Sequence, residues 1–253
     1  MHAFVTGASR GIGAAIAEHL AQLGYDLTLV ARSTGPLEEL AAKLPTRVRV
    51  QPADLSSTAA ALELIAPAEA ELGPIDVLVN NAGIQYVEPA VGISAERLER
   101  LFAVNLMTPI QLMNAVARDM VERSQGVIVN VTSMAGVTTT PGMTHYSATK
   151  AGFAAASEGL RMELRGSGVH VVTVYPGPVA TDMGEAAKAN LDMDLTARMA
   201  PEGTAQGLAE LVGRSIDRRS TRVFYPRSYQ SAWMLRPFAQ FLVDRFSPAT
   251  ADA

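Results

Sequence analysis

Three side chains between residues 133 and 150 could together move one proton. Tyr146 and Lys150 are four residues apart, a spacing that stacks both side chains on one face of a helix. A phenol has an unperturbed pKa of about 10, and a fixed ammonium beside it favours the phenolate and lowers that value. Ser133 follows the apolar run Val127 to Val131, so its hydroxyl could hydrogen-bond a substrate oxygen at the end of a buried strand. Taken alone, the Tyr-x-x-x-Lys pair could equally be an ordinary surface pair.

A glycine-rich turn near the start of the chain could hold a phosphate. Residues 7–13, Gly-Ala-Ser-Arg-Gly-Ile-Gly, connect the apolar run His2 to Thr6 to an amphipathic helix. A strand, a glycine turn and a helix amino terminus present backbone N–H groups and a positive dipole end to a pyrophosphate. The spacing departs from the common dinucleotide fingerprint, so a purely structural turn remains an alternative.

The residues after the second predicted strand bear on the choice of cofactor. An acidic residue at this point would bind the ribose 2′-OH of NAD, whereas an arginine can accommodate a 2′-phosphate. The chain has Ala31 and then Arg32 here, with Arg10 inside the glycine turn. Two guanidiniums near one phosphate favour NADP(H) over NAD(H), the alternative being that Arg32 is simply solvated.

The helix predicted over residues 94–121, with Ser94 as its cap, contains a proline. Pro109 has no N–H, so the carbonyl of Asn105, four residues earlier, loses its usual helical partner and could hold a water molecule. The same proline could instead only bend the helix around the core.

The elements that must position these groups are short buried strands separated by helices. A chain of 253 residues with 48% hydrophobic content suits one domain with a large core, and we expect a single domain over residues 1–253. The predicted strands are residues 2–6, 27–30, 48–51, 75–79, 127–131 and 169–175.

The composition argues against several classes of protein. A formal charge of −4 and a pI near 5.6 do not favour nucleic acid or an anionic membrane as the main partner. The chain has no cysteine and only four scattered histidines, so we expect no metal site. No apolar run approaches the roughly 20 residues that span a bilayer, and no signal segment precedes the first strand. We expect a cytoplasmic protein without a transmembrane segment.

Several motifs in order resemble the short-chain dehydrogenase/reductase family over about residues 1–226. They are residues 6–13, the Asn-Asn-Ala-Gly of residues 80–83, and Ser133, Tyr146 and Lys150 at their spacing. The resemblance implies an α/β fold, a single doubly wound, Rossmann-like parallel sheet flanked by helices on both faces. It also implies an NADP(H)-dependent oxidoreductase that interconverts an alcohol and a ketone or aldehyde, a small and apolar substrate, by hydride transfer.

The resemblance assigns a role to each catalytic residue. Ser133 would orient the carbonyl oxygen, Tyr146 would donate the proton, and Lys150 would lower the pKa of Tyr146 and hold the nicotinamide ribose. Asn105 would bind, through its backbone carbonyl, a water that links Lys150 to solvent. The predicted cofactor-binding residues are Gly7, Ser9, Arg10, Gly11, Ile12, Gly13, Arg32, Asp54, Leu55, Asn81, Ala82, Gly83, Tyr146, Lys150, Pro176, Gly177, Val179 and Thr181.

Two other functions fit the same motifs. A 3-oxoacyl-(carrier) reductase would need basic residues near the cleft, such as Arg123 or Arg165, to dock an acidic carrier. A non-catalytic NADP-binding regulatory protein would have no need for four groups arranged for proton transfer.

Three further segments carry predictions about substrate and assembly. Residues 183–200, rich in methionine, are expected to form a substrate lid, although core packing would also explain them. Residues 231–246 predict an amphipathic helix that covers the cleft, packs on a second subunit or lies in a membrane interface; few basic residues favour the first two. Small residues over 148–159 predict close packing, either on the chain's own sheet or on a second subunit in a homodimer or homotetramer.

Overall fold

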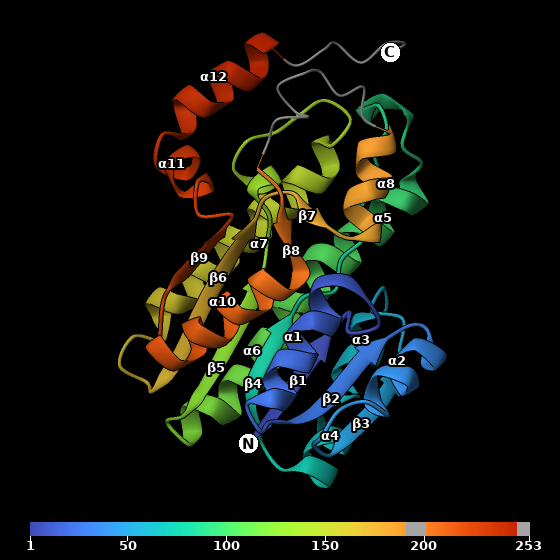
Figure 1. Ribbon diagram of the computed structural model, residues 1–253, viewed down its shortest axis with the longest axis vertical. Helices are drawn as coiled ribbons and strands as arrows, with labels where there is room; N and C mark the ends of the chain where they lie inside the picture. The colour runs from blue at the N-terminus through green and yellow to red at the C-terminus, as the bar shows by residue number, and fades with distance from the viewer. Residues whose placement is uncertain (191–200, 247–253) are drawn as a thin grey trace.

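A seven-stranded parallel sheet runs through the molecule (Figure 1). The computed structural model describes residues 1–190 and 201–246. The strand order is β3-β2-β1-β4-β5-β6-β9, and each neighbouring pair is parallel. The order reverses between β1 and β4, the topological switch point at which open α/β sheets bind ligands. The predicted doubly wound parallel sheet is therefore confirmed. The strands are β1 (His2–Thr6), β2 (Asp26–Ala31), β3 (Val48–Pro52), β4 (Ile75–Asn80), β5 (Gly126–Val131), β6 (Val169–Pro176) and β9 (Arg222–Tyr225).

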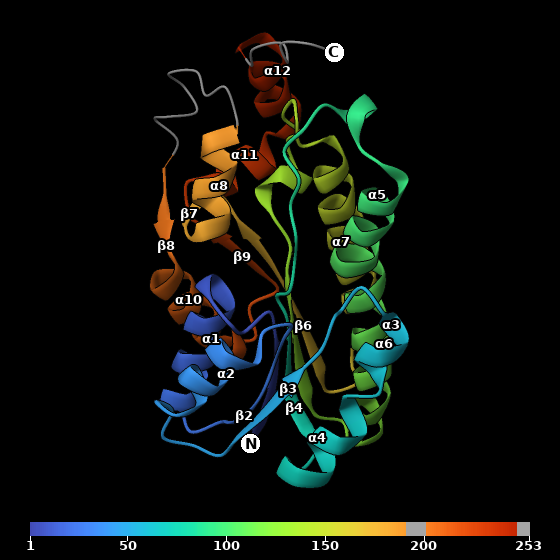
Figure 2. The same ribbon diagram turned by 90° about the vertical axis from the view of Figure 1, so that its right-hand side faces the viewer.

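Helices cover both faces of this sheet, as the edge-on view in Figure 2 shows. Side chains alternate between the faces: Ala3 and Val5 of β1 point into one apolar core, and Phe4 points into the other. Strands covered on both sides are apolar along their whole length, which is why the sequence shows them as continuous apolar runs. One face carries α1 (Gly11–Gln22), α2 (Thr34–Ala41) and α10 (Ala205–Arg218); the other carries α3 (Thr58–Leu62), α4 (Ile65–Leu72), α5 (Ala95–Phe102), α6 (Thr108–Glu122) and α7 (Thr144–Glu163).

The helix predicted over residues 94–121 is interrupted. It begins as predicted, because the Ser94 hydroxyl accepts a hydrogen bond from the N–H of Arg97 (3.3 Å). After α5, however, residues Ala103–Met107 form one π-helical stretch, labelled η2, before α6 begins. Pro109 lies in the first turn of α6, where a missing N–H is tolerated, and the hydrogen-bond ladder shifts in the turn before it. Asn105 therefore lies in a π-helical turn, not in a regular helix.

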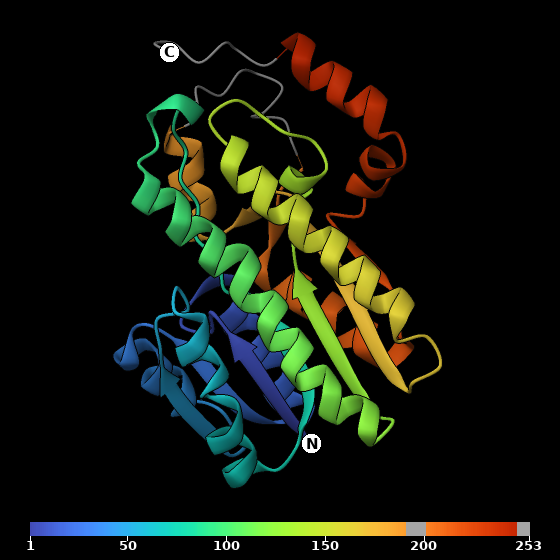
Figure 3. The same cartoon turned by 180° about the vertical axis from the view of Figure 1, so that it is seen from behind.

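The last two helices lie at the end of the molecule to which the carboxyl ends of the strands point (Figures 1 and 3). Over the range 231–246 the structure has α11 (Tyr229–Met234) and α12 (Arg236–Phe246). Pro237 cannot donate to the carbonyl of Trp233, four residues earlier, so the chain breaks between the two helices. None of the described helices is long and apolar enough to cross a membrane.

A second, two-stranded sheet joins the segment that follows β6. Its strands are β7 (Val179–Ala180) and β8 (Gly203–Thr204). Helix α8 (Asp182–Asn190) comes between them and begins the segment predicted to be a lid. The remaining residues of the predicted lid, 191–200, lie outside the described residues.

Candidate active site

The predicted catalytic residues come together at the carboxyl edge of the sheet. Ser133 follows β5, Tyr146 and Lys150 lie in α7, and Asn105 lies in η2. Tyr146, Lys150 and Asn105 are all buried. Four positions spread over 46 residues of sequence thus share one enclosed region, which supports the interpretation of Tyr-x-x-x-Lys as a site over that of a surface pair.

The phenol of Tyr146 is held in its protonated form. The interaction of its hydroxyl with the Ser133 side chain favours the phenolate and lowers the pKa of Tyr146. Burial has the larger effect and raises the pKa of Tyr146 to about 12, because a buried phenolate loses its hydration. Lys150 is not among the groups that shift the pKa of Tyr146 here, so its predicted effect on that pKa stays a prediction.

Lys150 is buried and hydrogen-bonded to the backbone. The Lys150 ammonium donates to the carbonyl of Val131 (3.0 Å), and its Nζ lies 5.9 Å from the centre of the Tyr146 ring. Burial lowers the pKa of Lys150 to about 8, so the positive charge is itself less favoured than on an exposed lysine. At neutral pH a lysine with this pKa remains mostly protonated, but its ammonium is engaged with the Val131 carbonyl, and burial of the phenol has the larger effect on the pKa of Tyr146.

Asn105 contributes a side-chain function that the sequence did not suggest. Its Oδ1 accepts from the N–H of Ile84 (2.8 Å), and its Nδ2 donates to the carbonyl of Ile84 (2.8 Å) and to the hydroxyl of Thr149 (3.2 Å). These bonds tie the segment after β4 to α7. A Cβ built on Gly83 would lie 3.5 Å from both Asn105 Oδ1 and Lys150 Nζ, so all three residues border the same small space.

The glycine turn forms a cradle of backbone. Gly7 and Gly11 have positive φ angles of 67° and 58°, which L side chains rarely adopt. A Cβ on Gly13 would lie only 2.2 Å from the carbonyl oxygen of Gly7. Arg10 occupies the N-cap position of α1, and its side chain makes no capping bond to the N–H groups at the amino end of this helix. Ser9 and Ile12 complete the turn, half-buried or more. The cradle therefore suits a diphosphate bound by backbone N–H groups and the helix dipole.

The Asn81–Gly83 segment is fastened to this cradle. The Thr6 hydroxyl accepts from the N–H groups of Asn81 (3.0 Å) and Ala82 (3.1 Å), and Asn81 Nδ2 donates to the carbonyls of Thr6 (3.0 Å) and Gly7 (3.2 Å). Thr6 was missed as a site residue, because a threonine at the end of an apolar strand looks like a core residue. The feature of the sequence that could have indicated its role is a hydroxyl side chain at the carboxyl end of the strand, next to the glycine turn.

The segment after β6 closes the cradle from the other side. A Cβ on Gly11 would lie 3.3 Å from Thr181 Cγ2, so Thr181 stands beside the glycine turn. The Thr181 hydroxyl donates to the carbonyl of Val179 (3.3 Å) and accepts from the N–H of Gly184 (3.2 Å). Pro176 and Gly177 lead into this segment from the end of β6. The structure thus brings Gly11 and Thr181 together; their contacts with a cofactor stay a prediction.

The two arginines predicted to bind a 2′-phosphate are both exposed. Arg32 follows β2, and the N–H of Ala8 donates to the carbonyl of Val30 (3.2 Å), which holds the glycine turn beside that strand end. Arg10 Nη1 pairs with Asp182 Oδ2 at 3.1 Å, and both side chains are more than two-thirds exposed. Such a pair is worth little in water, so Arg10 remains available to an anionic ligand.

Asp54 and Leu55 lie beyond β3. The Asp54 carboxylate accepts from the N–H of Ser56 (3.0 Å) and from Arg100 Nη2 (2.8 Å). These bonds hold the pKa of Asp54 below its usual range, the bond from Ser56 having the larger effect. Leu55 is buried, and its carbonyl accepts from the hydroxyl of Thr108 (2.8 Å). Arg100 was not singled out from the sequence, since a helix arginine has no distinguishing spacing.

The arginines suggested for docking a carrier protein do not border this site. Arg123 Nη1 pairs with Asp76 (2.9 Å) at the amino end of β4, the opposite edge of the sheet. Arg165 follows the end of α7 and precedes the start of β6, which is also an amino end. The structure therefore gives no support to this docking surface.

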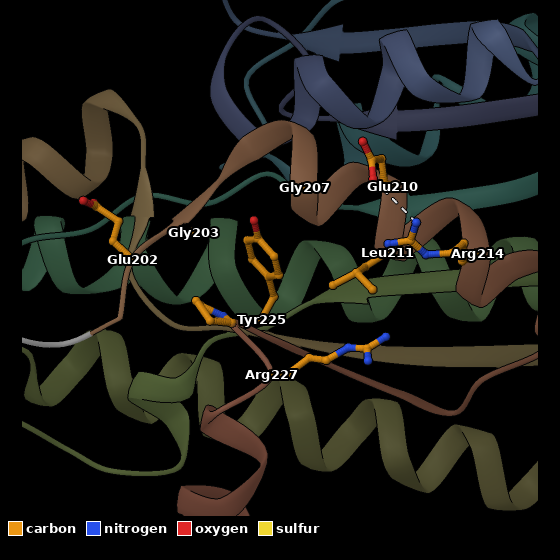
Figure 4. Close-up of a pocket in the computed structure, with 9 residues that line it drawn as sticks. Glu202, Gly203, Gly207, Glu210, Leu211, Arg214, Tyr225 and Arg227 are labelled. Carbon is orange, nitrogen blue, oxygen red and sulfur yellow. Dashed lines mark hydrogen bonds and ion pairs between the residues drawn. The ribbon is translucent and has the colours of Figure 1, made fainter.

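A separate hollow of about 430 Å³ lies along α10 and the end of β9 (Figure 4). Tyr225, Arg214 and Arg227 project around it, and Arg214 pairs with Glu210 at 3.5 Å. None of its lining residues is among the predicted site residues, so it is distinct from the site at Tyr146. The residues that line this hollow are Glu202, Gly203, Gly207, Glu210, Leu211, Arg214, Tyr225, Pro226 and Arg227.

Comparisons with known proteins agree with this geometry. The family model described as short chain dehydrogenase matches residues 1–192. Nodulation protein G of a Rhizobium species is 40% identical over 181 residues, 72% of this chain and 74% of the relative. Ketoacyl reductase HetN of a Nostoc species is 33% identical over 253 residues, 98% of this chain and 85% of the relative. A solved structure, the short-chain dehydrogenase from Sphingobium yanoikuyae in complex with NADPH, is 32% identical with a TM-score of 0.81, over 100% of this chain and 98% of that one.

Proposed function

This chain belongs to the short-chain dehydrogenase/reductase family, and from that premise we propose that it is an NADP(H)-dependent carbonyl reductase or alcohol dehydrogenase. Its substrate would be a small apolar ketone or aldehyde, or the matching alcohol. The observation that carries the proposal is that Ser133 acts on the hydroxyl of a buried Tyr146, with Lys150, also buried, on the next turn of the same helix.

In this mechanism, Ser133 and Tyr146 both bind the carbonyl oxygen. The Tyr146 hydroxyl donates its proton to that oxygen as negative charge develops on it, and the Ser133 hydroxyl holds the oxygen in line. When bound, the nicotinamide cofactor supplies or accepts the hydride. The raised pKa of Tyr146 keeps the proton in place at neutral pH, which suits the reductive direction. Lys150, aided by the backbone carbonyl of Asn105, would return a proton to Tyr146 from solvent.

The residues around the cradle fit a dinucleotide. Backbone groups of residues 7–13 would hold the diphosphate, Asp54 and Leu55 would contact the adenine, and the segments 81–83 and 176–181 would flank the nicotinamide ribose and ring. Exposed Arg32 and Arg10 would take the 2′-phosphate, in keeping with the NADPH in the Sphingobium structure.

A panel of carbonyl compounds tests the proposal. The purified protein, mixed with NADPH and with ketones and aldehydes of increasing size, is expected to oxidise NADPH only in the presence of a carbonyl acceptor. Loss of NADPH absorbance and the alcohol formed are measured together. Tight NADPH binding without turnover on any acceptor would favour the regulatory protein over the enzyme.

A 3-oxoacyl reductase is the second candidate, because the Nostoc ketoacyl reductase matches almost the whole chain. Since the two arginines considered for a carrier lie at the other edge of the sheet, we expect a simple 3-oxoacyl ester to be reduced as well as a carrier-bound one. A kcat/KM at least tenfold higher with the carrier-bound chain would contradict this expectation.

We further propose that the chain forms a homo-oligomer through α7. Ala148, Ala151 and Ala155 are exposed on one face of this helix, and a Cβ on Gly159 would meet no atom within 4 Å. A thin surface of this kind allows close approach of a second helix. Light scattering coupled to size-exclusion chromatography is expected to give a dimer or tetramer, and Ala155→Arg is expected to give a smaller species.

A further inference from the structure

The carboxyl-terminal helix α12 is hydrogen-bonded to the loop that joins Ser133 to Tyr146. We name residues 134–143 the Ser–Tyr loop. The N–H of Thr139 donates to Gln240 Oε1 (3.0 Å), and Gln240 Nε2 donates to the carbonyl of Thr139 (3.3 Å). One side-chain amide thus satisfies both backbone groups of one loop residue, as a neighbouring strand would.

Two further side chains strengthen this contact. Asp244, one turn further along α12, accepts from Gln240 Nε2 (2.7 Å) and so fixes which way the amide faces. Arg236, one turn earlier, donates from Nε to the carbonyl of Val137 (3.0 Å). The helix therefore holds the loop at two residues, 137 and 139, from one face.

Helix α11 anchors this arrangement to the sheet. The Trp233 ring packs against Phe224 of β9, with centroids 5.5 Å apart, and the Arg222 guanidinium lies 5.0 Å from the Trp233 ring centre. Arg222 in turn makes two hydrogen bonds of 2.6 Å to Glu158 of α7. These contacts attach α11 to β9 and α7, and α12 follows α11 directly. The position of α12 relative to the sheet is therefore fixed.

The Ser–Tyr loop also packs against Trp233 of α11. Met134 and Val137 of the Ser–Tyr loop form one apolar cluster with Tyr175, and Trp233 packs against that cluster. On the side away from α12, the N–H of Glu88 donates to the carbonyl of Gly142 (3.0 Å). The loop is thus held between the segment after β4 and the carboxyl-terminal helices.

We propose that α11 and α12 act as a clamp on the Ser–Tyr loop, with Gln240 and Arg236 as positioning residues for the carbonyl substrate. The inference rests on the proposed function, in which the substrate oxygen binds between the two ends of this loop. A loop that is ordered before binding costs the substrate no ordering free energy, whereas a loop ordered for only part of the time lowers the apparent affinity by that fraction. The clamp therefore acts on substrate affinity and leaves the proton-transfer groups unchanged.

The matched variants are Gln240→Ala and Gln230→Ala. Gln230 is an exposed glutamine of α11 whose side chain makes no hydrogen bond in the described part of the chain, so it controls for a truncated glutamine in the same region. In hydrogen–deuterium exchange of the full-length protein, Gln240→Ala is expected to speed exchange in the peptide that contains the Thr139 amide, and Gln230→Ala is expected not to. This readout does not depend on enzymatic activity.

Kinetics with ethyl 3-oxohexanoate and NADPH supply the second readout. For Gln240→Ala we expect KM for the ester to rise about fivefold, since two hydrogen bonds are lost, with kcat within about twofold of the native value. The dissociation constant of NADPH is expected to stay unchanged in both variants, because within the described ranges the Gln240 side chain hydrogen-bonds only Thr139 and Asp244.

The two proposals fail in distinguishable ways. Absence of turnover in the native protein refutes the proposed function, and the exchange experiment still decides whether the clamp exists. Unchanged exchange at Thr139 in Gln240→Ala overturns the clamp. Faster exchange with an unchanged KM overturns the positioning role, as does a fall in kcat with KM unchanged.

Discussion

The glycine cradle and the proposed carboxyl-terminal clamp are built in opposite ways. The cradle uses contiguous backbone: Gly7 and Gly13 leave no room for a Cβ, Gly11 has a positive φ angle, and residues 6 and 81 tie its parts together. The clamp uses a few side chains, chiefly Gln240 and Arg236, which act on residues about 100 positions away. A change in the cradle therefore displaces backbone, whereas a change in the clamp removes single hydrogen bonds. The cradle should tolerate substitution much less well than the clamp.

The outer surfaces of the two regions differ as well. The residues of β1 are all buried, whereas Phe238 and Phe241 of α12 are each 59% exposed. The stability of α12 thus depends on its polar contacts with the loop and on the packing of Trp233 of α11, with little contribution from burial of its own apolar side chains. This difference orders the expected effects below.

Tyr146→Phe should have the largest effect. Removing the proton donor is expected to lower kcat by about a thousandfold or more, in the range of general acid catalysis. Because the ring still fills its buried place, the dissociation constant of NADPH, measured by fluorescence titration, should stay within about twofold. Retained turnover would contradict the assigned role.

Lys150→Met is expected to change how stability depends on pH. The pKa of Lys150 is lowered to about 8 in the folded protein, so between pH 8 and its ordinary value of 10.5 the unfolded chain binds a proton that the folded chain does not. Raising the pH through this window therefore stabilises the native protein relative to the variant, by about 3 kcal/mol in all. Urea denaturation of both proteins at several pH values measures the difference; a difference that stays flat would refute a buried Lys150 with a lowered pKa.

Gly13→Ala tests the cradle itself. The new Cβ would lie 2.2 Å from the Gly7 carbonyl oxygen, so the backbone must move, at a cost of about 1–3 kcal/mol in stability and a clear loss of NADPH affinity. Gly35→Ala, in α2, is the control, because a Cβ there meets no atom within 4 Å and alanine favours a helix. Thermal unfolding and NADPH titration should separate the two variants. Equal behaviour would mean that the cradle is not as rigid as its contacts indicate.

Arg32→Ala should have the smallest of these effects and sharpens the cofactor proposal. Loss of one exposed charge-assisted contact to a 2′-phosphate is expected to weaken NADPH about tenfold and NADH hardly at all. Titration of both cofactors measures the ratio. Equal losses for the two cofactors would count against Arg32 as the residue that selects NADP(H).

Most of the sheet was accessible from the sequence because its signals are local. The predicted strands correspond to β1–β6, and the structure lengthens five of them by one or two residues. Parallel strands covered on both faces must be apolar throughout, so each could be recognised from its own residues. The glycine turn and the Tyr146–Lys150 spacing were recognisable for the same reason, since the required geometry lies within one turn or one helix.

The pKa shifts of Tyr146 and Lys150, and the hydrogen bonds between residues far apart in the chain, could be seen only in the folded structure. A four-residue spacing places Lys150 beside Tyr146. Which effect controls the pKa of the phenol, the ammonium or the loss of hydration, depends on how deeply the phenol is buried. That burial is produced by many segments of the chain packing together. The bonds from Asn105 to Ile84 and from Gln240 to Thr139 join residues that share no local pattern. Local sequence patterns were enough to predict the strands, the glycine turn and the candidate reacting groups. The packing of segments far apart in the chain determined the protonation of those groups and the contacts that hold them.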